Sequence, residues 1–242
     1  MSDTLQKYGH YRHLLARYTD DSRAFENDYR DLIIAEKNAR SVLPYSQRSN
    51  PNLTLHDAEH SYRVIKLINE IIDVILDNGN SLSDEEIKIL YYSAWYHDLG
   101  IVLSDNEYDG KPHKFDHAQL SAEILRKHSD EYFLFESESK EAFVDAVCRV
   151  IISHKHGTED VSEEITIGSN PVRLRLISAI LCLADLCDIS NRRAPTIVYQ
   201  LLTDELNAKP LNAEEVRHWK ANINTKIGLD SRKQLIFVEY SD

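Results

Sequence analysis

A carboxylate lies inside an apolar helical stretch, and this placement restricts the fold more than any other feature of the chain. The stretch, RLRLISAILCLADLCDIS, covers residues 173–190 and carries Asp185 in its second half. A charged side chain is costly to bury unless it is paired with an opposite charge or bound to a metal. The sequence therefore favours a helical core in which Asp185 meets a cation or a metal ion.

Apolar side chains recur at helical spacing along most of the chain. In residues 57–77 they run from Val64 to Leu76 at the 3.6-residue period, and Asn78-Gly79 ends this predicted helix. Ser83 with Glu86 three residues later forms a capping-box pattern, which predicts a second helix that ends near Gly100. We predict a mainly α fold, with further helices at 1–40 (two, broken near 19–21), 116–128, 138–154, 171–190 and 195–207, and a short helix or turn at 212–222.

The remaining segments predict loops and one β element. Residues 42–57, 101–116 and 155–170 lack a helical period, and prolines and asparagines interrupt the first of them. The tail TKIGLDSRKQLIFVEY has two β-type runs on either side of Asp230, which predicts a small C-terminal β-hairpin.

Composition limits the classes of partner. The 242 residues carry a formal net charge of −12, which argues against general nucleic-acid binding because that binding neutralises phosphates with Lys and Arg. A locally basic pocket for one small phosphorylated ligand stays possible. Cys148, Cys182 and Cys187 form no disulfide framework, the first 20 residues contain no signal-peptide core, and no apolar run is long enough to span a bilayer. We expect a cytoplasmic protein with no membrane partner.

Histidines and aspartates stand at the edges of, or within, the predicted helices in a fixed order. They are His60, His97, Asp98, His117, His154 and Asp185. Imidazole nitrogen and carboxylate oxygen suit Zn, Fe, Mn, Co or Ni as ligands. For any single histidine, a buried structural role is the commoner interpretation, so the argument rests on the whole set.

The order H…HD…H…H…D resembles the HD-domain metal-dependent phosphohydrolase superfamily over residues 55–193. The segments HSYRVIKL, WYHDLG, HAQLSAEIL, IISHKHG and LADLCDIS resemble the ligand segments of that superfamily. The resemblance implies a helical bundle around a metal centre, with an HD domain at 51–210, an N-terminal helical extension at 1–50 packed on it, and a C-terminal appendage at 211–242.

The resemblance also implies the metal ligands. His60, His97, Asp98 and Asp185 would hold one divalent ion, and His117 and His154 would hold a second, with Asp98 bridging the two. The ions would be Fe, Mn, Zn, Co, Ni or Mg. Together they would clamp a phosphoryl group and share a hydroxide nucleophile.

Residues next to the expected ligands leave alternatives open. Arg193 either grips a phosphate or forms a surface salt bridge, and Lys155 could also face the phosphate. Asp188 either orients a ligand imidazole or simply ends its helix. We expect Asp98, Lys155 and Arg193 to take part in catalysis.

Several further residues are more ordinary in context. His56-Asp57 repeats the HD dipeptide at a helix start, where His56 either faces the site or is a bystander. Asp116 is expected to cap a helix. His113 and His156 are either loop residues or substrate contacts, Tyr62 and Arg63 would lie near the pocket mouth, and YYSAWY is expected to pack in the core.

The resemblance favours a phosphomonoesterase or phosphodiesterase that acts on a nucleotide or related phosphate ester. Hydrolysis of cyclic di-GMP is disfavoured, because Ile101 follows HDLG and SHKHG lacks a Gly-Tyr-Pro signature, whereas the branch that cleaves dinucleoside polyphosphates fits better. Two alternatives stay open: a non-catalytic nucleotide-sensing module of a larger bacterial regulatory or defence-type protein, and a diiron oxygenase. Homo-oligomerisation or fusion to further domains is compatible with each.

Overall fold

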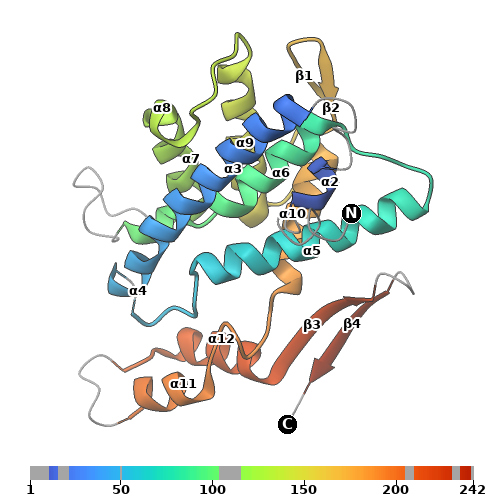
Figure 1. Ribbon diagram of the computed structural model, residues 1–242. Coiled ribbons are helices and arrows are strands. Elements are labelled where there is room, and N and C mark those ends of the chain that lie inside the picture. Colours follow the sequence, from blue (N-terminus) through green and yellow to red (C-terminus); the bar gives the residue numbers. More distant parts are fainter. Residues whose placement is uncertain are drawn as a thin grey trace.

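Long helices form most of the molecule, as Figure 1 shows. The computed structural model describes residues 11–15, 22–49, 51–103, 116–204, 210–230 and 235–240. The bundle is built from α2 (Arg12–Leu15), α3 (Ser22–Val42), α5 (Ala58–Asp77), α6 (Asp84–Tyr96), α7 (His117–Lys127), α9 (Lys140–His156) and α10 (Leu174–Cys187). The mainly α class predicted from the apolar period is confirmed.

Helix α6 runs through the core of the bundle and packs against α3, α5, α9 and α10. Its YYSAWY segment is buried, as predicted, and hydrogen bonds satisfy the polar atoms of Tyr91, Trp95 and Tyr96. The indole of Trp95 donates to the Tyr11 hydroxyl at 2.8 Å, and the Tyr91 hydroxyl donates to the Asn69 side-chain oxygen at 2.7 Å. Full burial of side chains of this size contributes roughly 2–3 kcal/mol each, so α6 is held rigidly up to its last turn.

The start of α6 is fixed by the predicted capping box. Ser83 accepts from the backbone N–H of Glu86, and the Glu86 carboxylate accepts from the backbone N–H of Ser83 at 2.7 Å. The same carboxylate, which is 1% exposed, also accepts from the guanidinium of Arg173 at 2.7 and 2.8 Å. Glu86 thereby joins the start of α6 to the residue just before α10.

Short elements occur where the sequence predicted only loop. Residues 165–172 form a hairpin of β1 (Ile165–Ile167) and β2 (Asn170–Val172), so the prediction of a loop to 170 and a helix from 171 was wrong there. The turn contains Gly168 at φ +60°, a conformation that glycine adopts without a steric penalty. The predicted loop at 42–57 likewise contains η2 (Leu43–Tyr45) and α4 (Ser46–Ser49), and η3 (Leu99–Val102) and α8 (Ser129–Tyr132) follow α6 and α7. Such one-turn elements are too short to show a period. The break predicted near 19–21 lies outside the described residues.

The C-terminal elements form a layer beside the start of α5, drawn at the bottom of Figure 1. They are α11 (Thr196–Leu202), α12 (Ala213–Asn224), β3 (Thr225–Asp230) and β4 (Leu235–Tyr240). Strands β3 and β4 pair antiparallel from Thr225↔Tyr240 to Asp230↔Leu235, which confirms the predicted hairpin. Hydrogen bonds tie this layer to the bundle: the Trp219 indole donates to the Asn52 carbonyl at 2.7 Å, and the Ile227 N–H donates to the Ile189 carbonyl at 3.1 Å.

Among the described helices, none combines the length and the apolar character that crossing a bilayer requires.

Candidate metal centre

The fold brings together the histidines and aspartates of the predicted set, which are far apart in the sequence. Helix α5 supplies His60 from its first turn, and the end of α6 supplies His97 and Asp98. Helices α7, α9 and α10 supply His117, His154 and Asp185. These residues form two groups, and within each group one ligand atom per residue lies within 4.8 Å of the others. Both groups could therefore hold a metal ion.

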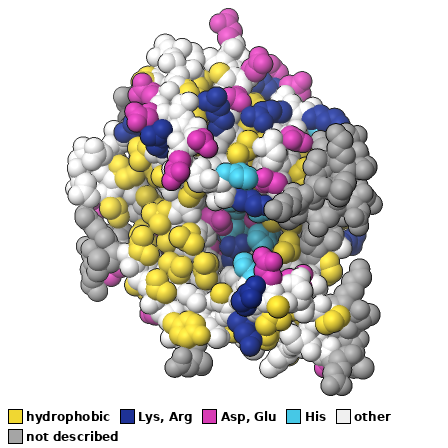
Figure 2. Space-filling model, turned by 180° about the vertical axis from the view of Figure 1, so that it is seen from behind, with side chains coloured by type: hydrophobic (Ala, Val, Ile, Leu, Met, Phe, Trp, Pro, Cys, Tyr) yellow, Lys and Arg dark blue, Asp and Glu magenta, His cyan; other side chains and the backbone are white. Residues whose placement is uncertain are grey.

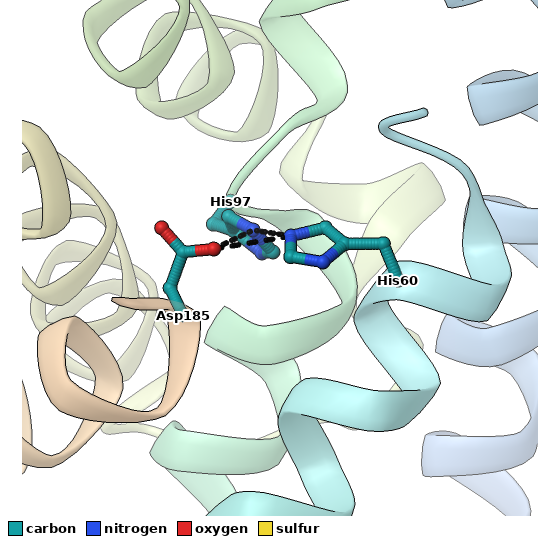
Figure 3. A group of neighbouring side chains, drawn as sticks. All are labelled: His60, His97 and Asp185. Carbon is teal, nitrogen blue, oxygen red and sulfur yellow. Dashed lines mark hydrogen bonds and ion pairs between the residues drawn. The ribbon is translucent and has the colours of Figure 1, made fainter. Parts of the chain in front are cut away.

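The first group contains His60, His97 and Asp185, which point toward one another in Figure 3. The Nε2 atom of His60 lies 3.1 Å from Nε2 of His97 and 3.1 Å from Oδ1 of Asp185. The Nε2 of His97 lies 3.9 Å from the same carboxylate oxygen. Both histidines are fully buried, so this group lies inside the bundle.

The second group contains Asp98, His117 and His154. The Nε2 atoms of His117 and His154 lie 3.0 Å apart, and Oδ1 of Asp98 lies 3.6 Å from Nε2 of His117. The other oxygen of Asp98, Oδ2, lies 3.2 Å from Nε2 of His97 and 3.5 Å from Nε2 of His60. The two oxygens of Asp98 thus face different groups.

Hydrogen bonds on the outer ring nitrogens set the tautomers of these histidines. The Nδ1 atoms of His97 and His154 donate to the carbonyls of Ala94 and Ile151, which can only accept. In a neutral imidazole of this tautomer, the Nε2 atom presents a lone pair to the site. His60 is held in the same way, because its Nδ1 donates to a carboxylate oxygen of Asp188 at 2.7 Å.

The donor set fits divalent metal ions. The facing Nε2 lone pairs of His60 and His97 would repel each other at 3.1 Å without a cation between them. Nitrogens about 2.1 Å from one ion and at right angles to each other lie about 3.0 Å apart. In the described part of the chain, Oδ2 of Asp98 and Oδ1 of Asp185 are buried without a hydrogen-bond partner. A bound ion would satisfy all of these atoms.

The protonation states of the metal-free site follow from burial and from the two carboxylates. Burial opposes the charged form of His97, but Asp98 and Asp185 outweigh it and raise the pKa of His97 to about 9. Burial lowers the pKa of His154 to about 4 and also lowers the pKa of His117. Near pH 7 His154 is therefore neutral and able to ligate, whereas His97 must lose a proton before it can.

Asp188 bonds the ring nitrogen of His60 that points away from the site. The sequence left open whether Asp188 orients a ligand imidazole in this way. Its carboxylate accepts from His60 and also from Arg63, whose Nε and Nη2 lie 2.8 and 3.0 Å from its two oxygens. Such contacts orient a ligand imidazole and raise its basicity. The sequence reasoning placed Arg63 only near a pocket mouth. Its position three residues after His60, on the same side of α5, was the available signal.

Gly100 and Ser121 fix the distance between the two groups. The Ser121 hydroxyl accepts from the Gly100 N–H at 2.8 Å and lies 2.8 Å from the carbonyls of His97 and His117. A Cβ atom at Gly100 would lie 2.2 Å from the His117 carbonyl oxygen. Only glycine therefore lets the turn after Asp98 lie this close to the helix that carries His117.

Arg193 lies at the edge of the first group with unused hydrogen-bonding capacity. It is 8% exposed, its Nη1 lies 3.6 Å from Oδ1 of Asp185, and its Nε has no hydrogen-bond partner among the described residues. Burial, followed by the charge of Arg193, lowers the pKa of His56 to about 3, so His56 is neutral. His56 lines the approach to the site, while Asp57 caps α5 by accepting from the His60 N–H at 2.9 Å.

The remaining predicted residues surround the start of α7. Asp116 caps that helix by accepting from the Gln119 N–H at 3.2 Å, as expected. It also contacts His156 at 2.6 Å and the Lys155 amine at 3.7 Å. Lys155 is therefore held beside the second group, and its catalytic role stays a prediction. Tyr62 is covered by Lys66, whose amine lies 4.3 Å from its ring, and His113 lies outside the described residues.

One face of the molecule gives access to the centre. Figure 2 shows histidine side chains gathered in a hollow in the middle of this face, with acidic and basic side chains among them. The candidate centre itself is reached by solvent, since the side chains of Asp185 and His117 are 24% and 18% exposed.

A helical bundle with this set of histidines and aspartates defines an HD-type domain. The family model described as HD-CE matches residues 51–241, and the chain belongs to that family. No significant match was found among curated proteins or among solved structures. The matched range covers the predicted HD domain at 51–210 and all but the last residue of the predicted appendage at 211–242. The boundaries near 50 and 210 stay predictions.

Proposed function

We propose that the chain is a metal-dependent phosphohydrolase that acts on a nucleotide or related phosphate ester through two divalent ions. The observation that carries the proposal is the division of the Asp98 carboxylate, with Oδ2 facing His97 and Oδ1 facing His117. A carboxylate placed in this way is suited to hold two ions at the spacing that phosphoryl-transfer sites use, about 3.5–4 Å.

The histidines and aspartates would bind the ions, and Arg193 would orient the substrate. His60, His97 and Asp185 would hold one ion, His117 and His154 the other, and Asp98 both. When bound, the ions would supply Lewis-acid stabilisation of the phosphoryl oxygens and lower the pKa of an attacking water. Arg193, buried with an unused Nε, would donate to a phosphate oxygen and keep the phosphorus in line with that water.

The charge distribution supports an anionic substrate at this place. The chain as a whole carries −12, so an anion is repelled over most of the surface. Within the site, Arg193 and the ions would provide the positive charge, and Lys155 lies beside the second group. Fixed charges in a water-poor site stabilise the developing charge on phosphorus more strongly than solvent does.

The decisive experiment combines metal content with hydrolysis. The full chain, purified without a chelator, should contain about two ions, and a variant with His117→Ala and His154→Ala should contain about one. With added Mn²⁺, the wild-type chain should hydrolyse p-nitrophenyl phosphate or bis(p-nitrophenyl) phosphate. Asp98→Asn should lower kcat by at least about 100-fold.

His128→Ala is a suitable control, because the His128 side chain lies at the C-terminal end of α7 and contacts the exposed Glu131 side chain at 3.0 Å. This variant should keep both the ions and the activity. A wild-type chain with no stoichiometric metal and no hydrolysis of either ester with Mn, Fe, Co, Ni, Zn or Mg would contradict the proposal.

A further inference from the structure

A cavity of about 360 Å³ separates the candidate metal centre from α12. Its inner end is lined by His56 and His117, and its outer end by Glu214 and His218 of α12. This volume is within the range that small-molecule sites use. The cavity therefore has the size of a ligand site and joins two parts of the chain that are distant in sequence.

The cavity opens onto the candidate metal centre. His117 belongs to the second group of ligands, and the ring of His56 lies 6.0 Å, centre to centre, from that of His60. A molecule whose phosphate reached the ions would therefore extend its other end into the cavity. The cavity continues the site described above and does not form a separate one.

The polar atoms along the cavity favour hydrogen-bond donors over phosphate. His56 donates through Nδ1 to the Thr54 carbonyl at 2.6 Å, which leaves its Nε2 as an acceptor in the neutral ring. Glu214 uses its backbone N–H, and not its carboxylate, in the cap formed by Asn212. A carboxylate repels a phosphate and accepts from N–H and O–H groups. Arg193 lies 3.6 Å from Oδ1 of Asp185, and its positive charge also acts on His56 and His218.

Apolar side chains complete the lining. Leu53 from the segment before α5 and Ile101 from η3 both face the cavity. A ligand group with flat apolar faces and donors at its edge matches apolar walls combined with acceptors. A nucleobase with its ribose has this character, and a simple sugar has the donors without the flat faces.

We propose that this cavity binds the nucleoside part of a nucleotide substrate, and that Glu214 of α12 accepts hydrogen bonds from its N–H or O–H groups. The inference rests on the proposed phosphohydrolase function and narrows its substrate from phosphate esters in general to nucleotides. Arg193 and the ions would take the phosphate while α12 discriminates between nucleosides. Glu214 is then a specificity-determining residue.

The test compares substrates in the metal-loaded full chain. The 5′-monophosphates of adenosine, guanosine, cytidine and uridine are compared with ribose 5-phosphate and p-nitrophenyl phosphate. At least one nucleotide should be preferred over both other esters in kcat/KM. Glu214→Gln should lower this preference about fivefold, mainly through KM, because one hydrogen bond to a charged acceptor is weakened.

Glu141→Gln is the matched control, since Glu141 is an exposed carboxylate in the first turn of α9, at the opposite end of that helix from His154. It should leave the preference unchanged, and thermal melting should show that both variants are folded. Equal preferences in the wild-type chain and Glu214→Gln, or ribose 5-phosphate serving as well as every nucleotide, would overturn the inference.

Calorimetric titration separates the two proposals. If no ester is hydrolysed, the proposed function fails, and the four nucleosides are titrated into the metal-loaded chain. Binding that Glu214→Gln weakens about fivefold would support the cavity assignment independently of turnover. No binding of any nucleoside would overturn the assignment as well.

Discussion

The Nε2 atoms of His60 and His97 face each other at 3.1 Å, while the Nδ1 atom of each ring already donates to an oxygen. In the metal-free chain a proton on His97 relieves this contact, and Asp98 and Asp185 hold that proton so that the pKa is about 9. A metal must displace it. Loading the site should therefore release a proton at any pH below about 9.

The apparent affinity for Zn²⁺ should consequently rise about tenfold per pH unit between pH 7 and 8.5. An ordinary histidine ligand would give a plateau above its usual pKa of about 6.5. Competition with a chromogenic chelator, corrected for the chelator's own protonation, measures the slope. His154→Ala should bind less zinc and keep the slope, since His154 is already neutral. An affinity that is flat above pH 7 would refute the assignment of the proton to His97.

Asp188 should govern metal affinity without contacting the ion. The Asp188 carboxylate accepts from Nδ1 of His60 and is neutralised by Arg63. Asp188→Asn removes this charge, and we expect the affinity for the metal ion to fall about tenfold. Asp77→Asn makes the same chemical change at the exposed end of α5 and should have no effect. Equilibrium dialysis of both variants would decide the matter. Equal affinities would reduce Asp188 to a structural partner of Arg63.

Arg193→Gln should separate substrate binding from metal binding. The variant should keep both ions while kcat/KM for phosphate esters falls about 10- to 100-fold, because a charged donor to phosphate is lost. Arg193→Lys should recover part of the loss, since a lysine keeps the charge without the planar fork. Metal analysis gives the number of bound ions, and steady-state kinetics gives kcat/KM. Loss of an ion from Arg193→Gln would show instead that Arg193 acts by positioning Asp185.

Gly100→Ala should disturb the second group of ligands selectively. The added methyl group would meet the His117 carbonyl at 2.2 Å, so α7 must move, at a cost of about 3 kcal/mol of unfolding free energy. We expect the metal content to fall from two ions to about one. Gly79→Ala offers a contrast, because nothing lies within 4 Å of its Cβ position and only its φ of +76° opposes the change. The free energy of unfolding of that variant should fall by about 1 kcal/mol, and its metal content should not change.

Glu86 should make stability depend on pH in the acid range. Burial opposes its charged form, but the hydrogen bonds from Arg173 outweigh burial and lower its pKa below the ordinary 4.5. A lowered carboxylate pKa stabilises the fold above the unfolded-state pKa, and this contribution is lost as the pH falls through the folded-state value. Glu86→Gln should therefore cost about 2 kcal/mol near pH 7 and progressively less below pH 4.5.

Urea unfolding at several pH values measures that difference. Glu85→Gln, one residue earlier in the first turn of α6, is the matched control, since Arg173 bonds Glu86 and not its neighbour. If the difference in unfolding free energy between wild type and Glu86→Gln stayed constant with pH, the lowered pKa of Glu86 would be contradicted.

The helices and the convergence of the site residues were predictable for a physical reason. Each of those residues lies in or beside a helix whose apolar face must turn inward, so side chains such as Asp185 are carried into the core together. The only signal for the contact between Arg63 and Asp188, 125 residues apart, was the position of Arg63 three residues after His60. The β1–β2 hairpin was missed because three-residue strands give no period. The cavity needs α12 beside residues 52–56, which local sequence does not specify.

The hydrogen bond from the Trp219 indole to the Asn52 carbonyl limits where the domain can be cut for fusion to another protein. A second bond, from the Leu55 N–H to the Arg193 carbonyl at 2.8 Å, anchors the same lead-in segment from another direction. Excising the bundle at residue 210 would keep every histidine of the metal centre and remove Trp219. A chimera should therefore keep the whole C-terminal part of the stretch 51–241 that the family shares, together with α2 and α3, which pack against α6.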